Sequence, residues 1–367
     1  MFFDHIIYYL GIGGFKLLGV PPLPHKSDQR AGDLISKATT NLLNNWECKD
    51  SVYGMCFDTT SSNTGHLTAA CVAIQRELGS PLLWLACRHH IGEVILDEVW
   101  NVSKIETSKS PDVTIFKSFR EKWDHISHYD TSDLSFPKSQ KKLQQKKDAI
   151  INLLKDSLLA EFTRGDYKEL VQLSLLYLSG EVSEGYRFAH PGALHKARWM
   201  AKLIYSIKIV LMSEKIQREL RSDDVLSNAQ LTKLQKFVMF AVYVYVPWWL
   251  TCPVASAAPL NDLKLIANVI DYRKCNKCCA DGALDAISRH MWYLTEELVP
   301  LALFSSQVDG VTKRKMADKL NCDEKRVNIL QHFNTFLLGK RFITCAVELN
   351  FNSIFVFFLD VHARFVS

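Results

Sequence analysis

Asp58 follows directly on a short apolar run, Val52–Phe57, which is rich in strand-forming residues. Small hydroxyl residues and Asn63 come next, as is typical of a turn or a helix cap. A carboxylate at the end of a strand suits Mg²⁺ or Mn²⁺, because hard divalent cations prefer carboxylate oxygens. An aspartate at such a position is also a frequent helix cap, and this is the simpler interpretation of Asp58 taken alone.

A thiol and an imidazole form a second candidate group, Cys87-x-x-His90. One helical turn would place both on the same face, where they could ligate zinc. Zinc needs further ligands, and the nearest candidates, in the segment 275–279 (CNKCC), have no matching second pair beside them. We therefore expect isolated buried cysteines and no structural zinc. A cysteine-protease role for Cys87 lacks any oxyanion or orienting motif.

These two groups flank a segment with helical periodicity. Apolar residues recur at helical spacing over 67–78, Gly79 follows, and the apolar run 82–86 predicts a second strand. A strand-helix-strand unit implies a parallel crossover, and ligand sites in such sheets gather at the carboxyl ends of the strands. The spacing therefore predicts that Asp58 and the Cys87 motif share one edge of a sheet.

The N-terminal segment is apolar but makes a poor signal peptide or membrane span, because Asp4, Lys16 and four glycines interrupt it. We predict a buried strand at 5–10 and a glycine turn at 11–14, which lacks the spacing of a dinucleotide fingerprint. A helix ending near Asn45 follows, with Ser27 and Asp28 as its expected caps.

Beyond His90 the chain is predicted to be helical up to about residue 308. The helix expected at 231–250 is predicted to be ended by Pro247 and Pro253 and has an almost uncharged second half. Its lysines and the early proline favour a buried bundle helix over a membrane helix. The tail from Phe342 is apolar and strand-prone. It could add strands to the sheet, pack on the bundle, or lie outside the ancestral fold.

Composition restricts the class of protein. Of 367 residues, 48% are hydrophobic and 23% are charged, which is typical of a globular chain. The net charge of +5 permits nucleic acid as a partner without requiring it. The basic run 138–147 could meet phosphates, but a solvated helix start or loop is the favoured interpretation. Ten cysteines without a signal peptide favour a reducing compartment, so we expect an intracellular location, nuclear or cytoplasmic.

Four stretches together resemble transposon-derived proteins of the hAT-like group. They are FDTTSSNTG (57–65), LLWLACRHH (82–90), GALHKARWMAK (192–202) and RHMWYLTEEL (289–298). The resemblance spans roughly residues 11–320 and implies an α/β fold of mostly α content, in which a large all-helical insertion interrupts a ribonuclease H-like sheet core. We accordingly expect a partial core of strands and crossover helices at 1–102, the insertion domain at 103–308, and a C-terminal helix with the apolar tail at 309–367.

The resemblance also assigns roles to particular residues. Asp58 matches the family's second catalytic aspartate, and Cys87 and His90 match its supporting C-x-x-H motif. Arg198 and Trp199 look like the Arg-Trp pair associated with the flipped base at the cleaved DNA end, a contact that a cation beside an indole suits. From the residues alone, a tryptophan packed in the bundle beside an arginine that reaches solvent is favoured.

The sequence departs from the family pattern at the other two acids. Asp4 precedes the first strand found here and does not match the family's first aspartate, and no Glu-Arg pair occurs at the third position. Glu296 and Glu297 lie in a family-like stretch that belongs to the insertion. Two-metal phosphoryl transfer needs carboxylates on both metals, and Asp58 alone cannot supply them.

We therefore expect a domesticated or degenerate transposable-element protein, catalytically inactive, whose partner is DNA or another protein. One alternative is an active Mg²⁺- or Mn²⁺-dependent DNA nuclease or transposase that uses Asp58 with Asp4 and Glu296 or Glu297. A further alternative is a helical scaffold that binds protein or membrane through the pair 248–249 and the apolar tail; we do not favour a membrane. No motif for a small-molecule substrate is evident.

Overall fold

The computed structural model describes residues 7–11, 14–21, 29–65, 67–80, 82–106, 113–126, 131, 133–136, 141–162, 164–181, 186–192, 199–220, 226–252, 255–289, 302–303, 305–319 and 354–358. The chain divides into two compact units. The first, called here the sheet unit, comprises 1–91, 251–262 and 290–367. The second, the helical unit, comprises 92–250 and 263–289. The division into domains at 1–102, 103–308 and 309–367, predicted from the sequence, stays a prediction.

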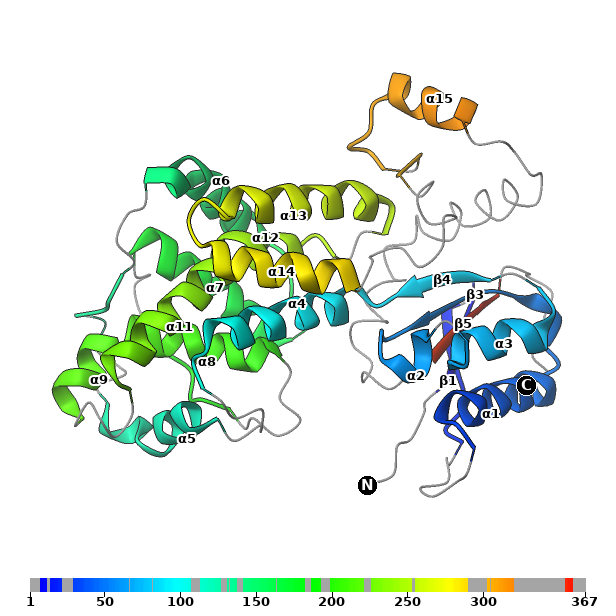
Figure 1. The fold of residues 1–367 in the computed structure, drawn as a ribbon, viewed down its shortest axis with the longest axis horizontal. Coiled ribbons are helices and arrows are strands. Elements are labelled where there is room, and N and C mark those ends of the chain that lie inside the picture. The colour runs from blue at the N-terminus through cyan, green and yellow to red at the C-terminus, as the bar shows by residue number, and fades with distance from the viewer. Residues whose placement is uncertain are drawn as a thin grey trace. The chain divides into compact units, whose positions relative to one another are not determined.

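The sheet unit contains a five-stranded mixed sheet of order β2-β1-β5-β3-β4 (Figure 1). Its strands are β1 (Ile7–Gly11), β2 (Gly14–Gly19), β3 (Val52–Phe57), β4 (Leu83–Ala86) and β5 (Ile354–Phe358). Its helices include α1 (Ala31–Asn45), α2 (Ser61–Thr64), α3 (Ala70–Leu78) and α15 (Gly310–Lys319). The fold is thus an α-rich α/β fold, as the sequence predicts.

The predicted strand-helix-strand unit is confirmed as β3, α3 and β4. The two strands pair in parallel, with Gly54 opposite Leu83 and Phe57 opposite Ala86. The helix begins at Ala70, so the prediction that Leu67 lies on its apolar face is wrong, and Leu67 is 80% exposed. Three consecutive residues before Ala70 form a turn and bend, which postpones the helix start.

Two further strands lie on the other side of β3. The predicted strand near the N-terminus is β1, and it forms a hairpin with β2, a strand that the sequence pattern did not predict. The C-terminal tail supplies β5, which pairs in parallel with β1 and antiparallel with β3. Residues 354–358 of the tail therefore add a strand to the sheet, which is the first of the alternatives predicted from the sequence.

The core of the sheet unit lies between the strands and helices α1 and α3. Ile35 and Leu43 of α1 and Ile74 of α3 are fully or almost fully buried against Met55 and Phe57 of β3. The predicted end of α1 at Asn45 is confirmed, but its N-cap is Arg30, without a side-chain hydrogen bond. The expected caps at 27–28 lie outside the described residues.

The helical unit is built from helices in all its described regular segments, as predicted for this part of the chain. Their bounds are α4 (Arg88–Ser103, which begins in the sheet unit), α5 (Thr114–Glu121), α6 (Lys141–Leu158), α7 (Gly165–Ser179), α8 (Trp199–Leu211), α9 (Ser213–Glu219), α11 (Asn228–Phe240), α12 (Val246–Trp249), α13 (Ala258–Tyr272, also begun in the sheet unit) and α14 (Lys277–Arg289).

The long apolar stretch is a buried helix of the bundle. It runs through α11, a π-helix at Ala241–Tyr245, and α12. The expectation that Pro247 ends this helix is wrong: the wider π-helical turn precedes the proline, which then occupies the first turn of α12, where its missing N–H is tolerated. None of the helices among the described residues combines the length and apolar character needed to cross a membrane.

Gly32 permits the close approach of α1 to the turn before α3. A Cβ atom at this position would lie 2.3 Å from the backbone oxygen of Thr68 and 2.9 Å from Cα of Ala69. We expect Gly32→Ala to lower the free energy of unfolding by about 1–3 kcal/mol, because backbone atoms must move apart. Thermal denaturation followed by circular dichroism would measure it.

Gly165 provides the matched control, since a Cβ there meets nothing within 4 Å. Gly165→Ala should leave the melting temperature unchanged or slightly raised. Equal stability of the two variants would contradict the close approach at Gly32.

Candidate functional site

Asp58 lies at the carboxyl end of β3, and its side chain is buried, with 5% of the residue exposed. Its Oδ1 accepts three hydrogen bonds: from the backbone N–H of Thr60 (3.1 Å), from the hydroxyl of Thr60 (2.6 Å) and from Nδ2 of Asn63 (2.7 Å). Thr60 is the N-cap residue of α2, and Asn63 lies within that helix. Asp58 thus fixes the turn between β3 and α2. None of these three donors is a backbone N–H of the first turn of α2, so Asp58 stabilises the turn before the helix and is not its cap.

The second carboxylate oxygen of Asp58 has a different environment. No hydrogen bond to Oδ2 occurs among the described residues. Two oxygens of neighbouring residues, Oγ1 of Thr59 and Oδ1 of Asn63, are buried and have no hydrogen-bond partner within the described part of the chain. These three oxygens are chemically suitable for a hard cation, although two of them are neutral and weaker ligands than carboxylates.

The Cys87 motif lies at the same edge of the sheet, as predicted. The backbone N–H of Cys87 donates to the carbonyl of Phe57 (2.8 Å), immediately after the last paired residues of β3 and β4. The carbonyl of Cys87 accepts from Ile91 (3.1 Å), so Cys87 begins the first turn of α4 and half-buried His90 lies within that turn.

The thiols of Cys56 and Cys71 are buried and lie near Asp58. Burial raises the pKa of the Cys56 thiol above its usual range, and the nearby Cys87 and Asp58 raise it further. Burial, followed by the charge of Asp58, likewise raises the pKa of Cys71. Both thiols are therefore protonated, and poor nucleophiles, at neutral pH. No group of three or more His, Cys, Asp or Glu side chains in the described part of the chain could hold a metal ion.

A buried ion pair at the start of α4 is a feature that no sequence motif indicated. The guanidinium of Arg88 donates from both terminal nitrogens to the two carboxylate oxygens of Asp262 in α13. The Arg88 side chain is 12% exposed and that of Asp262 is 1% exposed. Cys252 lies close by: burial raises the pKa of its thiol, and Arg88 opposes this rise. The pair ties the segment 251–262 to the rest of the sheet unit.

Several predicted site residues lie outside the described residues: Asp4, Arg198, Glu296 and Glu297. Trp199 is the first residue of α8. The structure therefore brings Asp58, Cys87 and His90 to one edge, and the pairing of Asp58 with further catalytic acids stays a prediction.

The remaining cysteine and lysine motifs have structural contacts. The Cys278 thiol donates to the carbonyl of Val102 (3.4 Å), and Cys279 lies 3.6 Å from the Ser103 hydroxyl, so these cysteines pack α14 on α4. In the basic run, Lys146 pairs with Asp271 at 2.7 Å.

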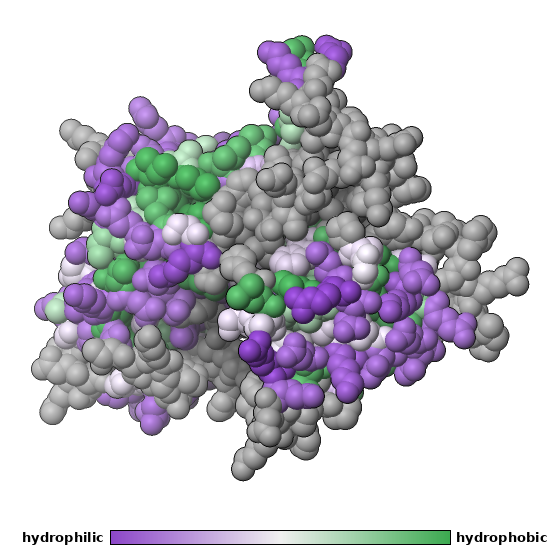
Figure 2. Space-filling view, turned by 45° about the vertical axis from the view of Figure 1, so that its right-hand side comes forward, coloured by the Kyte–Doolittle hydropathy of each residue, from purple (hydrophilic) through white to green (hydrophobic). Residues whose placement is uncertain are grey.

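The tryptophans suggested for a scaffold surface are buried. Trp248 and Trp249 are 6% and 5% exposed. On the face shown in Figure 2, hydrophilic side chains cover much of the described surface, and hydrophobic ones form smaller groups between them. A docking role for these two indoles is therefore not supported by their positions.

Comparison of the chain with models of protein families, with curated proteins and with solved structures gave no match. The resemblance to hAT-like proteins accordingly rests on the four sequence stretches alone.

Two substitutions at Asp58 test its role in fixing the turn between β3 and α2. Asp58→Ala removes the acceptor of three hydrogen bonds and should cost about 1–3 kcal/mol of unfolding free energy. Asp58→Asn keeps an oxygen acceptor, and its new N–H₂ group can donate to the unpartnered oxygens of Thr59 and Asn63. Chemical denaturation should give Asp58→Asn a free energy of unfolding close to that of the wild type. An equal loss of free energy in Asp58→Ala and Asp58→Asn would contradict the role of Asp58 in fixing the turn.

The Arg88–Asp262 pair should matter far more than an exposed pair. Asp262→Asn leaves the Arg88 charge buried without its counter-charge and should cost about 3–5 kcal/mol. The matched control is Asp281→Asn, since Asp281 pairs with Arg273 on the surface (side chains 38% and 50% exposed). An exposed pair contributes about 0–1 kcal/mol, so urea denaturation should show a clear difference. Similar urea midpoints for Asp262→Asn and Asp281→Asn would contradict the expected difference in stability between the buried and the exposed ion pair.

Proposed function

We propose that this chain is a transposase-derived protein with a partial ribonuclease H-like core that associates with nucleic acid without cleaving it. One observation carries the proposal: the matching catalytic acid, Asp58, accepts three hydrogen bonds on Oδ1 from its own turn and so has a structural role. A nuclease needs several carboxylates converging on its metal ions. The order of the four motifs supports the transposase origin, and the parallel β3–β4 pair is compatible with it.

Helix α15 offers a basic surface for phosphate contacts. Lys313, Arg314 and Lys315 are consecutive in this helix, and no ion pair involves them among the described residues. Arg314 and Lys315 are exposed, and the helix, at the top of Figure 2, shows mostly hydrophilic side chains. Unpaired cations of this kind bind a nucleic acid backbone by releasing its counterions.

DNA binding and DNA cleavage can be tested separately. Fluorescence anisotropy with a labelled duplex should show binding that weakens steeply with salt. The variant K313Q/R314Q/K315Q should have a salt slope shallower by up to about 2.7, or about 0.9 for each phosphate that is no longer neutralised. The triple variant R218Q/R273Q/K274Q is the control, because each of these side chains already pairs with a carboxylate. Salt-independent binding, or equal effects of both variants, would contradict the basic-surface proposal.

The cleavage test uses supercoiled plasmid with Mg²⁺ or Mn²⁺. We expect no nicking above background. Nicking by the wild type that disappears in Asp58→Asn, a variant expected to fold normally, would establish the active enzyme instead.

A metal-dependent nuclease is the second candidate function. It is favoured by three oxygens that accept no hydrogen bond from the residues that the structure describes: Oδ2 of Asp58, Oγ1 of Thr59 and Oδ1 of Asn63. In that case Mn²⁺ should raise the melting temperature of the wild type and leave that of Asp58→Asn unchanged.

A further inference from the structure

Four thiols of the sheet unit gather near the ends of β3 and β4. They belong to Cys56, Cys71, Cys87 and Cys252. Three of the four are buried, and Cys87 is half-buried, so Cys87 is the member of the group that solvent reaches. Redox-sensitive cysteines are typically accessible thiols with a second thiol close by.

Cys87 lies at the positive end of a long helix. Its carbonyl accepts from the N–H of Ile91 (3.1 Å), which puts the cysteine at the N-cap position of α4, a helix of 16 residues. The first turn of this helix contains no acidic residue, and Arg88 is its first residue. Because Asp262 offsets the Arg88 charge, the main positive influence on Cys87 is the helix N-terminus. Such a position favours the thiolate, the nucleophilic form of cysteine.

Cys252 lies beside the same turn of α4 and is 2% exposed. Burial raises the pKa of its thiol; the Arg88 charge opposes this rise, Asp262 and Cys87 add to it, and a hydrogen bond with Arg88 opposes it. Electrostatic effects of this kind fall with distance, so these groups are near neighbours. The two hydrogen bonds from Arg88 to Asp262 hold the segment 251–262 against the turn that carries Cys87.

The other two thiols are poorly placed to bond with Cys87. The strand register puts Cys56 opposite Leu85, two residues before Cys87. From the spacing of strands and residues in a sheet, the Cα atoms of Cys56 and Cys87 are about 8 Å apart. A disulfide needs Cα atoms within about 7 Å. Cys71 belongs to the core cluster that α3 forms with the sheet. Cys252 is therefore the better partner.

We propose that Cys87 and Cys252 form a peroxide-sensitive dithiol, in which Cys87 is oxidised first and a disulfide to Cys252 then joins the end of β4 to the segment 251–262. The oxidant is a small hydroperoxide, of which hydrogen peroxide is the simplest. This inference is independent of Asp58 and of the proposed function.

The chemistry takes two steps. In the first, the Cys87 sulfur attacks one oxygen of hydrogen peroxide, the O–O bond breaks, and the leaving hydroxide takes up the thiol proton to give water and a sulfenic acid. In the second, the Cys252 sulfur attacks the Cys87 sulfur, the S–O bond breaks, and the hydroxide leaves as water with the Cys252 proton. Two thiols are oxidised to a disulfide, and one peroxide is reduced to two molecules of water.

The disulfide would close a long covalent loop. Cys87 precedes the boundary between the two units at 91–92, and Cys252 follows the boundary at 250–251. The loop thus contains the whole segment 92–250. Because closing a long loop restricts the unfolded chain, the oxidised protein should melt at a higher temperature than the reduced protein.

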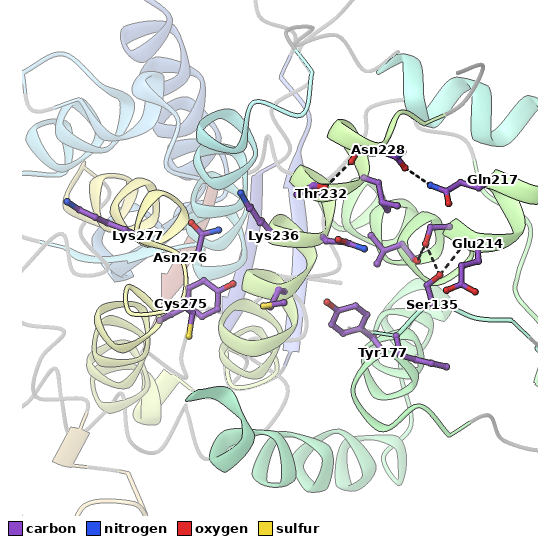
Figure 3. Close-up of a pocket in the computed structure, with 17 residues that line it drawn as sticks. Ser135, Tyr177, Glu214, Gln217, Asn228, Thr232, Lys236, Cys275, Asn276 and Lys277 are labelled. Atoms are coloured by element: carbon purple, nitrogen blue, oxygen red, sulfur yellow. Dashed lines mark hydrogen bonds between the residues drawn. The ribbon is translucent and has the colours of Figure 1, made fainter. Parts of the chain in front are cut away.

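Two thiols of the helical unit provide internal controls. Cys278 is exposed, and half-buried Cys275 lies in the wall of a cavity of about 850 Å³ (Figure 3). If accessibility alone determined the order of oxidation, Cys278 would react before Cys87. We expect the opposite order.

Peptide mapping by mass spectrometry tests this order on the full chain. The reduced protein is treated with limiting hydrogen peroxide, its remaining thiols are alkylated, and the chain is digested. We expect a cross-linked peptide pair containing Cys87 and Cys252 while Cys275 and Cys278 are still found alkylated. Dithiothreitol before alkylation should remove the cross-link.

Substitutions separate the two steps. Cys252→Ala should stop the reaction at the sulfenic acid of Cys87, which dimedone traps, and Cys87→Ala should leave Cys252 as a thiol. Cys278→Ala is the matched control and should leave the cross-link unchanged. Peroxide should raise the melting temperature of the wild type and of Cys278→Ala but not that of Cys252→Ala. A cysteine with only a packing role would not make the melting temperature depend on peroxide.

Three results with the wild type would overturn the proposal, whatever the folding of the variants. One is oxidation of Cys275 or Cys278 before Cys87. Another is a disulfide between Cys87 and a cysteine other than Cys252. The third is the absence of any disulfide at Cys87 under peroxide concentrations that oxidise Cys278.

Discussion

The hydrogen bond from the backbone of Cys87 to the carbonyl of Phe57 fixes the edge on which the candidate site is built. It follows the last paired residues of the parallel strands β3 and β4 and so brings the two strand ends together. Asp58 and the first turn of α4 are the residues that leave these strand ends. This parallel register determines where the Asp58 carboxylate, the buried thiols and the Arg88–Asp262 pair lie.

Each unit contains an ion pair with a buried partner. In the sheet unit Arg88 meets Asp262, and in the helical unit Lys208 meets Glu169 and also donates to the carbonyl of Ala189 (2.7 Å). Burial lowers the pKa of Lys208, and Glu169 opposes this shift. Such pairs seldom add much stability compared with apolar contacts, but leaving one partner alone is costly. They therefore select one packing of the segments that carry them.

Local patterns predicted the parts of the fold that depend on neighbouring residues. The alternation of apolar runs and helical spacing identified β3, α3 and β4, and Gly79 ends α3 with φ of 68° as expected of a left-handed cap. Periodicity could not predict that Arg88 would meet Asp262, since no pattern links residues so far apart. Nor could it decide between a structural role and metal binding at Asp58, because both use the same residue types. The positions of three donors were needed to show that Asp58 fixes the turn.

The central place of β5 has a consequence for how the chain folds. Ile7 pairs with Ile354, so the sheet joins segments from near both ends of the sequence. During synthesis, β1 and β3 emerge early, but the strand that lies between them is made only after the helical segments. The early strands must wait with exposed edges, which is a slow and aggregation-prone situation. A late strand at the centre of the sheet therefore makes this sheet slower to complete than one built from neighbouring strands.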